Sequence, residues 1–349
     1  FYCFSSGSRT RTYDLRVMSP TSYLLLYPAL WVQIYKLILQ QPTYFLGTMY
    51  ICAKYMKKHK SGFVTIVGNP NVGKSTLMNA WVGERLSIIT SKAQTTRHRI
   101  LGIINGDDYQ MVLSDTPGVI KPSYEMQSSM MDFVKIALDD ADILIYMVEI
   151  GEKEMKDTAF FEKIKGSKIP LLLLINKIDT ADQDILMTTI AFWKEMLPMA
   201  EVFPISAITG FSVKEVLDYI IEKLPEGPAY YPKDQLTDKP ERFFVNEAIR
   251  EQILQYYSKE IPYSVEVDTE DFFEEEKIIK IRSVIMVERD TQKGIIIGHK
   301  GTALKRVGVG ARKTLQAFFG KKVHLELYVK VNKDWRNNIA QLKRFGYKH

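Results

Sequence analysis

The sequence predicts two domains in series: an α/β domain with a mostly parallel sheet and helices on both faces, then a small α+β domain. Three observations support this. The chain has 349 residues, more than one small module needs. From residue 63 onward, short apolar runs alternate with amphipathic stretches, which is typical of a parallel sheet buried on both faces. Four prolines between residues 225 and 240 then indicate a boundary, after which the order of expected elements changes.

The alternation places the strands and helices of the first domain. The expected strands, each a short apolar run, are Phe63–Val67, Gln110–Ser114, Ile143–Val148, Pro170–Ile175 and Val202–Ile205. The expected helices, each an amphipathic stretch that follows one of these runs, are Thr76–Val82, Met126–Leu138, Thr158–Ile164, Leu186–Met196 and Val213–Leu224. The Leu171–Leu174 run would also suit a buried helix, but its shortness and the flanking Pro170 and Asn176 favour a strand.

The second domain is expected to have the order α-β-β-α-α-β. Its first elements are a helix over Arg242–Ser258 and two strands over Tyr263–Asp268 and Ile278–Val287. Two helices then flank the segment Gly294–Gly301, and the second of them covers Thr302–Phe319. The last element is a strand near Val323–Val331. The acidic cluster Glu270–Glu276 is expected to be a solvated turn. The predicted limits are 56–226 for the first domain, 227–240 for a linker and 241–349 for the second domain.

Composition excludes several classes of protein. With 46% hydrophobic and 25% charged residues, the chain is neither collagen-like, nor a coiled-coil rod, nor wholly disordered. Cys3 and Cys52 are its only cysteines. A disulfide scaffold, a cysteine-based zinc site and a thiol nucleophile are therefore excluded from the main body, and a reducing, cytoplasmic setting is expected.

The net charge of +6 is unevenly distributed along the chain. Residues 56–290 contain 28 basic and 38 acidic residues, whereas residues 291–349 contain 14 basic and two acidic residues. An acidic body with a basic end indicates a catalytic part joined to a part that meets a polyanion. A solvated basic tail is the alternative.

Residues 1–55 differ in composition from the rest. They contain an uncharged run of 19 residues, Val17–Tyr35, which is long enough to be a candidate membrane span. Pro20 and Pro28 interrupt this run. Because Met56 opens a Met-Lys-Lys sequence, we expect residues 1–55 to be translated upstream sequence outside the fold. A membrane anchor, or a disordered or folded extension, is the alternative.

Residues 68–75 fit the phosphate-binding pattern G-x-x-x-x-G-K-[ST] directly after an expected strand. Gly68 and Gly73 let backbone N–H groups converge on phosphate oxygens, and the following helix offers its positive end to the same anion. Lys74 is expected to bridge the β- and γ-phosphates and Ser75 to ligate Mg²⁺. The nucleotide contacts expected here are Gly68, Asn69, Pro70, Asn71, Val72, Gly73, Lys74, Ser75 and Thr76.

A second motif, Asp115-Thr116-Pro117-Gly118, follows the strand that ends at Ser114. Asp115 is expected to hold a water on Mg²⁺, and Gly118 to offer its N–H to the γ-phosphate. The D-x-x-G pattern alone is common in turns, but it gains weight after the second strand of a chain with a phosphate-binding loop. The expected contacts are Asp115, Thr116, Pro117, Gly118 and Val119.

The motif Asn176-Lys177-Ile178-Asp179 indicates the base. One carboxylate can accept both N1–H and the 2-amino group of guanine, whereas adenine has neither donor and would leave Asp179 unpaired. Asn176 is expected to fix the loop and the Lys177 stem to pack on the ring. At a later strand end, Ser206 and Ala207 are expected to place the Ala207 N–H on guanine O6. Alone, N-K-x-D could be a helix-capping turn, but four motifs in order favour guanine.

With these motifs in order, residues 56–349 resemble a translation-factor-class GTPase, and more narrowly the Era family of bacterial GTPases. The sequence Gln94-Thr95-Thr96-Arg97-His98 is similar to the first switch of that family. The resemblance implies that Thr96 closes on Mg²⁺ and the γ-phosphate, with Thr95 as the neighbouring alternative. The expected metal ligands are Ser75, Thr96 and Asp115.

The resemblance also bears on hydrolysis. Ras-like GTPases orient the attacking water with a Gln just after D-x-x-G, a position that Val119 occupies here and where it can orient nothing. In related hydrophobic-substituted GTPases a phosphate-loop Asn helps to hold K⁺, which implies that role for Asn71. The expected catalytic residues are Lys74, Thr96, Gly118 and Asn71, with GTP/GDP, Mg²⁺ and K⁺ as cofactors and slow intrinsic turnover.

The second domain carries a candidate RNA site at Gly298-His299-Lys300-Gly301. Two glycines between helices, in a domain of type II KH order with a basic end, resemble a KH domain. The expected RNA contacts are Ile297, Gly298, His299, Lys300, Gly301, Lys305, Arg306, Trp335 and Arg336. Trp335 suits stacking on bases, with a C-terminal helix that docks Trp335 into the core as the alternative. Resemblance to Era implies 16S ribosomal RNA near its 3′ end as the ligand.

We therefore expect a cytoplasmic, monomeric GTP-hydrolysing switch that binds 16S ribosomal RNA and acts in small-subunit assembly. Peripheral contact with the inner face of the cell membrane is left open. One alternative is a membrane-anchored GTPase signalling component that uses residues 1–55. Another is an RNA-binding module whose nucleotide site only senses guanine-nucleotide levels.

Overall fold

The computed structural model of the chain describes residues 59–154 and 157–348. The interpretations of residues 1–55 and of Met56 lie outside the described residues. Within these two ranges, no helix is both long enough and apolar enough to cross a lipid bilayer.

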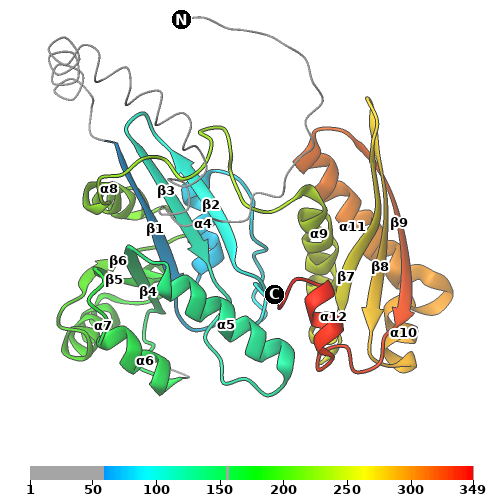
Figure 1. The fold of residues 1–349 in the computed structure, drawn as a ribbon. Helices are drawn as coiled ribbons and strands as arrows, with labels where there is room; N and C mark the ends of the chain where they lie inside the picture. The colour runs from blue at the N-terminus through cyan, green and yellow to red at the C-terminus, as the bar shows by residue number, and fades with distance from the viewer. Residues whose placement is uncertain (1–58, 155–156, 349) are drawn as a thin grey trace, which may run out of the picture. The chain divides into compact units, whose positions relative to one another are not determined.

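The first domain is built on a six-stranded sheet with the strand order β2-β3-β1-β4-β5-β6 (Figure 1). Its strands are β1 (Lys60–Val67), β2 (Ile100–Asn105), β3 (Tyr109–Asp115), β4 (Ile143–Glu149), β5 (Leu171–Asn176) and β6 (Glu201–Pro204). All neighbours are parallel except β2, which pairs antiparallel with β3. The predicted α/β class with a mostly parallel sheet is confirmed, and the Leu171–Leu174 run is a strand.

Strand β2 was not among the predicted elements. It forms a hairpin with β3 and is buried at Ile100, Leu101 and Gly102 because helix α4 (Lys74–Val82) and the linker both cover it. A Cβ added to Gly102 would lie 2.8 Å from a methyl group of Val82 in α4. The backbone N–H of Ile103 donates to the carbonyl of Leu236 at 2.8 Å. These contacts come from segments distant in sequence.

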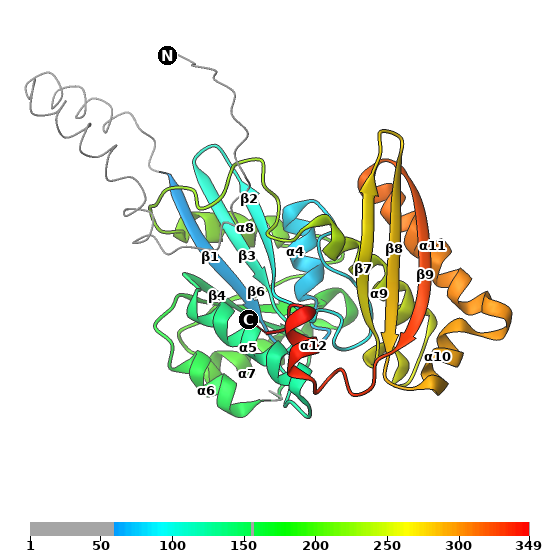
Figure 2. The same cartoon turned by 45° about the vertical axis from the view of Figure 1, so that its right-hand side comes forward.

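Helices cover both faces of this sheet, as predicted (Figure 2). The helices are α4 (Lys74–Val82), α5 (Glu125–Asp139), α6 (Thr158–Lys165), α7 (Gln183–Met196) and α8 (Val213–Lys223). One buried cluster joins α4 and α8 to the sheet through Leu77, Met78 and Ile220. The other joins α5, α6 and α7 to the opposite face through Met130, Phe161 and Trp193. The chain therefore alternates strand and helix around two apolar layers.

The segment predicted to be a linker, residues 227–240, is ordered along the first domain. The amide of Gln110 accepts from the N–H groups of Tyr230 and Tyr231 at 2.6 and 2.9 Å. The Asp238 carboxylate accepts from the N–H of Leu101 at 3.0 Å. These bonds fix the connection to the edge strands β2 and β3.

The second domain has a three-stranded sheet of order β7-β8-β9, with β7 antiparallel and β9 parallel to β8. Its elements are α9 (Glu241–Tyr256), β7 (Glu266–Glu274), β8 (Ile278–Val287), α10 (Asp290–Ile297), α11 (Thr302–Phe319) and β9 (Lys322–Val331). Ile249, Ile285 and Val307 lie in the buried cluster between helices and sheet. The order α-β-β-α-α-β is as expected, and it is followed by a short helix α12 (Ile339–Arg344), in line with the C-terminal helix that was the alternative for the segment around Trp335.

The acidic cluster Glu270–Glu276 is not simply a turn, which corrects that expectation. β7 continues to Glu274, and only the tip of the β7–β8 hairpin is a turn. Paired lysines offset part of the negative charge there, with Lys280 2.6 Å from Glu275 and Lys321 2.6 Å from Glu274.

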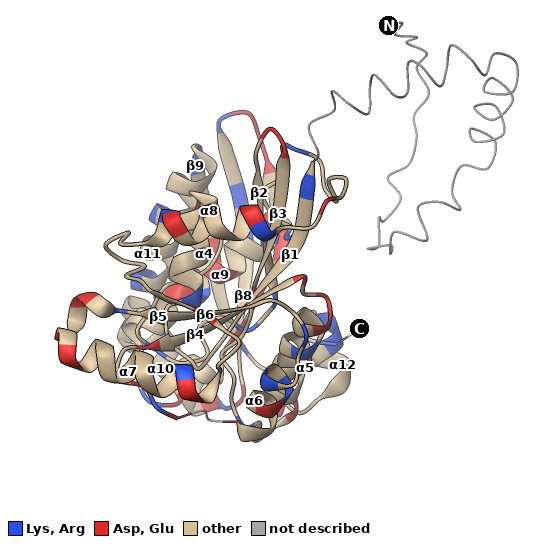
Figure 3. Ribbon diagram, turned by 90° about the vertical axis from the view of Figure 1, so that its left-hand side faces the viewer, with Lys and Arg blue, Asp and Glu red and all other residues tan. Residues whose placement is uncertain are grey.

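The C-terminal segment after β9 docks on the first domain. Trp335, Leu342 and Tyr347 are fully buried in the same apolar cluster as Met126 and Val134 of α5. The N–H of Met126 donates to the carbonyl of Arg336 at 2.9 Å. The basic residues of α12, Lys343 and Arg344, are exposed, and Figure 3 marks the basic positions along the ribbon.

Candidate nucleotide site and RNA-binding loop

The loop between β1 and α4 has a conformation that only glycine permits at two positions. Gly68 and Gly73 have φ of 155° and 105°. A Cβ at Gly68 would lie 2.1 Å from the carbonyl oxygen of Met147, and one at Gly73 would lie 2.2 Å from the side-chain nitrogen of Asn176. Both glycines are thus needed for the loop to curl against β4 and β5, which leaves its N–H groups at the start of α4.

Lys74 is buried in the curl of this loop. Its ammonium donates to the carbonyls of Gly68 at 3.1 Å and Asn69 at 2.9 Å. Burial lowers the pKa of Lys74 to about 8, although the nearby carboxylates of Asp115 and Glu152 act in the opposite direction. A phosphate anion beside this ammonium would favour the charged form, so the site is suited to a phosphorylated ligand.

Three predicted metal ligands lie together at the start of α4. The Ser75 hydroxyl lies 2.7 Å from the Asp115 carboxylate and 2.9 Å from the Thr96 hydroxyl. Thr96 in turn lies 3.4 Å from the same Asp115 oxygen. The three residues come from α4, the first switch and β3, which are distant in sequence.

These three residues fit Mg²⁺. Asp115 is fully buried, and its second carboxylate oxygen has no hydrogen-bond partner among the described residues. Burial raises the pKa of Asp115, while the hydrogen bond from Ser75 and the charge of Lys74 lower it. A hard divalent cation would supply the missing positive charge, and hydroxyl and carboxylate oxygens are ligands that Mg²⁺ prefers. No cluster of three or more His, Cys, Asp or Glu side chains offers another metal site in the described ranges.

Thr96, not Thr95, faces the predicted Mg²⁺ ligands. The Thr95 hydroxyl donates to the carbonyl of Lys92 at 2.6 Å and lies 2.9 Å from the Thr90 hydroxyl, within its own loop. The geometry therefore favours Thr96 where the sequence left both residues open.

The Asp115–Gly118 motif packs tightly against the phosphate loop. The Thr116 hydroxyl donates to the carbonyl of Ile66 at 2.7 Å. A Cβ at Gly118 would lie 2.7 Å from Cα of Pro70. Val119 is fully buried, and its N–H donates to the carbonyl of Gly68 at 3.1 Å. Val119 thus fills space and anchors backbone.

The base-recognition loops are tied to each other and to the phosphate loop. Asn176 donates to the carbonyl of Val72 at 2.7 Å and accepts from the N–H of Ala207 at 2.9 Å. The Asp179 carboxylate accepts from the Ser206 hydroxyl at 2.5 Å. These bonds orient Asp179. The Ala207 N–H, which we expected to face guanine O6, is instead donated to Asn176, because that buried amide needs its own partner.

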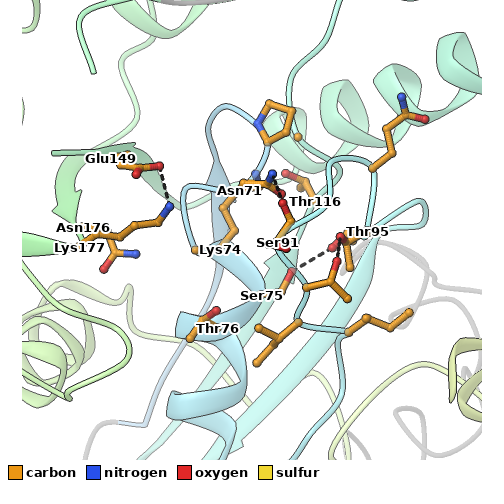
Figure 4. A pocket seen from close by; sticks show the side chains of 18 of the residues that line it. Asn71, Lys74, Ser75, Thr76, Ser91, Thr95, Thr116, Glu149, Asn176 and Lys177 are labelled. Carbon is orange, nitrogen blue, oxygen red and sulfur yellow. Dashed lines mark hydrogen bonds and ion pairs between the residues drawn. The ribbon is translucent and has the colours of Figure 1, made fainter. Parts of the chain in front are cut away.

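These elements surround a pocket of about 500 Å³ (Figure 4). Of the predicted site residues, it is lined by Pro70, Asn71, Gly73, Lys74, Ser75, Thr76, Thr96, Thr116, Gly118, Asn176 and Lys177. Gln94 and Thr95 of the first switch line it as well. Asn71 donates to the carbonyl of Ser91 at 2.9 Å, which ties the phosphate loop to the segment just before the first switch (Figure 4). The pocket thus holds phosphate-, metal- and base-directed groups on one side of the sheet.

Several lining residues were missed by sequence reasoning. They are Ile88, Ile89, Thr90, Ser91, Glu149 and Ile208. Among these missed residues, only Glu149 carries a charge at a strand end, the end of β4, that could have marked it as a site residue. Glu149 pairs with Lys177 at 2.6 Å (Figure 4). Asp179, Ser206 and Ala207 lie just outside the lining set, next to Lys177 and Ile208 in sequence.

The predicted RNA-binding loop is exposed between α10 and α11. His299 and Lys300 are both exposed, and Lys300 has a φ of 48°. A Cβ at Gly298 would lie 2.6 Å from Cβ of Ala303, whereas one at Gly301 meets no atom within 4 Å. Gly298 is therefore required by packing, and Gly301 leaves open space for an approaching strand. Lys305 and Arg306 continue the exposed basic surface along α11.

The expectation that Trp335 stacks on RNA bases is wrong in this structure, and docking into the core is observed. Its side chain is fully buried, and its indole N–H donates to the carbonyl of Ser264 at 3.1 Å. Arg336 pairs with Glu288 and lies 4.7 Å above the ring of Tyr124. Both residues fasten the C-terminal segment to its surroundings.

The fold and the site together define a P-loop GTPase joined to a KH domain. Residues 63–177 match a family model described as 50S ribosome-binding GTPase, and residues 260–336 match the KH domain model. The chain is 43% identical over 294 residues to GTPase Era of Staphylococcus haemolyticus, and this alignment covers 84% of this chain and 98% of that protein. The chain therefore belongs to the Era family, and it is a GTPase.

Solved structures of Era agree with this assignment. One is Aquifex aeolicus Era, in a variant form, bound to GDP·AlF₄⁻. Another is Era in complex with MgGDPNP and nucleotides 1506–1542 of 16S ribosomal RNA. Each has a TM-score of 0.80 and 36% sequence identity, and covers 83% of this chain and 100% of its own.

Proposed function

We propose that this GTPase is a switch that binds 16S ribosomal RNA near its 3′ end through the second domain and acts in small-subunit assembly. The observation that carries this is the presence, in one chain, of a guanine-nucleotide pocket and an exposed G-x-x-G loop with basic surroundings. A solved Era structure that covers 83% of this chain holds MgGDPNP and nucleotides 1506–1542 of 16S ribosomal RNA. The family model that matches residues 63–177 is described as a 50S ribosome-binding GTPase, so the test below distinguishes 16S from 23S RNA.

The nucleotide is GTP or GDP, with Mg²⁺. Ser75, Thr96 and Asp115 would hold the ion, which supplies positive charge beside the phosphates when bound. Lys74 presents an ammonium to the β- and γ-phosphates, and the backbone of the phosphate loop and Gly118 present N–H donors. Asp179, oriented by Ser206, accepts the two donors on guanine. These groups bind and orient the nucleotide for attack by water.

Turnover is proposed to depend on K⁺ through Asn71. Val119 is apolar and buried, so it cannot orient the attacking water. Asn71 has a φ of 68° and bonds the carbonyl of Ser91 at 2.9 Å, which places its amide between the phosphate loop and the first switch. A monovalent cation held there would add positive charge near the phosphates.

The RNA is proposed to pass over the G-x-x-G loop, where Gly301 leaves the backbone open and Lys300, Lys305 and Arg306 attract phosphates. Ile297 and His299 flank that path. Action in the cytoplasm, a monomeric state and peripheral membrane contact remain predictions. The membrane-anchored alternative depends on residues 1–55, which lie outside the described residues, so we do not propose it.

Crosslinking in cells, followed by sequencing of the bound RNA, tests this function. The full chain should enrich the 3′ region of 16S RNA. Gly301→Asp should reduce that enrichment about tenfold, because a carboxylate would stand where phosphate approaches. Gly301→Asn is the matched control, since Asn tolerates the same positive φ without the charge. Enrichment of 23S RNA, or full binding by a folded Gly301→Asp chain, would contradict the proposal.

A further inference from the structure

The first switch is held by the second domain as well as by the nucleotide pocket. Lys92 donates to the carbonyls of Leu254 and Tyr257, at the end of α9. Arg250 of α9 donates to the carbonyl of Thr95. The backbone on one side of Thr96 is therefore fixed by contacts with α9 and the residue that follows it.

The other side of Thr96 is fixed by a buried arginine. Arg97 is 1% exposed and donates to the carbonyls of Val265 at 2.7 Å and Pro262 at 3.0 Å. It also donates to the carboxylate of Glu266, the first residue of β7, at 3.2 Å. A buried guanidinium with this many fixed acceptors has little freedom to move.

The C-terminal Tyr347 completes this group. Its hydroxyl donates to the same Glu266 oxygen at 2.8 Å. Its ring stacks on His98, the residue after Arg97, with 4.3 Å between ring centroids. Tyr347 is 2% exposed, and its N–H donates to the carbonyl of Leu342 in α12. Tyr347 thus contacts one switch residue directly and a second through Glu266.

We propose that Tyr347 and Glu266 are positioning residues for Thr96: they hold Arg97 and His98, and so keep the Thr96 hydroxyl beside Ser75 and Asp115. This inference rests on the proposed role of Thr96 as a Mg²⁺ ligand and extends it. The second domain then contributes to the nucleotide site without touching the nucleotide. A change at Tyr347 should weaken the use of Mg²⁺ with GTP and spare GDP, whose binding does not need the γ-phosphate contact of Thr96.

The test uses the full chain, without RNA, and three single variants. Tyr347→Phe removes only the hydroxyl, and Tyr347→Ala removes the ring as well. Tyr328→Phe is the control, because it removes another tyrosine hydroxyl of the second domain, in β9 and away from the switch, where the ring lies beside Arg282. The measurements are the Mg²⁺ concentration for half-maximal GTP turnover, the dissociation constant of GDP, and the thermal midpoint.

We expect Tyr347→Phe to raise the Mg²⁺ midpoint about fivefold and to leave GDP affinity within about twofold, since one buried hydrogen bond to a charged group is lost. Tyr347→Ala should raise the midpoint further. Tyr328→Phe should leave it unchanged. If Tyr347→Ala lowers the thermal midpoint, that variant is destabilised, and the Mg²⁺ midpoint of Tyr347→Phe decides the outcome.

A double-mutant cycle separates positioning from a purely structural role. In a Thr96→Ala background, Tyr347→Phe should have no further effect on the Mg²⁺ midpoint, because its effect passes through the Thr96 hydroxyl. Equal effects in both backgrounds, or a wild-type midpoint in Tyr347→Phe, would overturn the inference. If Thr96→Ala itself leaves the midpoint unchanged, the proposed ligand role of Thr96 fails and the inference fails with it.

Discussion

Guanine selectivity is expected to depend on Asp179, and the variant Asp179→Asn tests it. The substitution keeps the shape of the side chain but removes its charge and replaces one acceptor by a donor. The Ser206 hydroxyl, 2.5 Å from Asp179, can still donate to the amide oxygen. Asn176 still fixes the loop through Val72 and Ala207. The change is therefore confined to the atoms that meet the base.

The size of the effect follows from two hydrogen bonds. The carboxylate accepts both N1–H and the 2-amino group of guanine, whereas the amide accepts one and directs an N–H at the other. Losing a charge-assisted bond and leaving a donor unpaired costs about 3 kcal/mol. That loss corresponds to GTP affinity about 150-fold weaker. Xanthine carries a 2-keto group where guanine has its amine, so the amide N–H gains an acceptor and the preference should reverse.

Equilibrium binding of GDP and xanthosine diphosphate to the full chain measures both changes. Asp182→Asn is the matched control, because Asp182 is an exposed aspartate three residues further on, at the start of α7. It should leave both affinities unchanged. If Asp179→Asn still prefers the guanine nucleotide, the loop has been assigned to the wrong role.

Four further predictions concern Lys74, the K⁺ role of Asn71, Trp335 and residues 1–55. Because burial lowers the pKa of Lys74 to about 8, its side chain is mostly a neutral amine above that pH and must take up a proton to pair with phosphate. GDP affinity should therefore fall about fourfold from pH 7 to 8.5, with proton uptake that calorimetry in two buffers detects; no uptake would contradict the shift. Replacing K⁺ by Na⁺, or Asn71→Ala, should slow GTP turnover much more than Val119→Ala, which should stay within a few-fold; equal rates in both salts would exclude the K⁺ role. Trp335→Ala should lower the free energy of unfolding by about 4 kcal/mol in urea titrations, since a fully buried indole is lost; RNA affinity of the folded chain should not change. A chain that begins at Met56 should bind GTP and RNA as well as the full chain, and loss of either activity on deletion would assign residues 1–55 a structural role.

The nucleotide site could be predicted because its parts follow parallel strands. Gly68, Asp115 and Asn176 lie at or directly after the carboxyl ends of β1, β3 and β5, and such ends meet at one edge of a parallel sheet. Spacing along the chain was therefore enough to bring them together. Each motif also has a local chemical signature, a glycine turn or a strand-end carboxylate, that survives in the sequence.

The parts that sequence reasoning missed depend on contacts between distant segments. Strand β2 is buried only because α4 and residues 236–238 cover it. The choice of Thr96 over Thr95 depends on how Arg97 and Arg250 fix the backbone on either side. Trp335 lies among basic and amide residues, a composition that suits RNA binding as well as docking. The apolar surface on α5 and the carbonyl of Ser264, which accepts from the indole N–H, decide between the two.

The docking of the C-terminal segment also changes what its charge means. Residues 291–349 contain 14 basic residues, but several of them face carboxylates of the protein. Arg336 pairs with Glu288, Arg344 with Asp268 at 2.7 Å, and Lys348 with Glu125 at 2.8 Å. A cation that already has a carboxylate partner releases fewer counterions when RNA binds. The salt dependence of RNA affinity should therefore reflect the exposed Lys300, Lys305 and Arg306 beside the G-x-x-G loop, and should be shallower than the total charge of the segment implies.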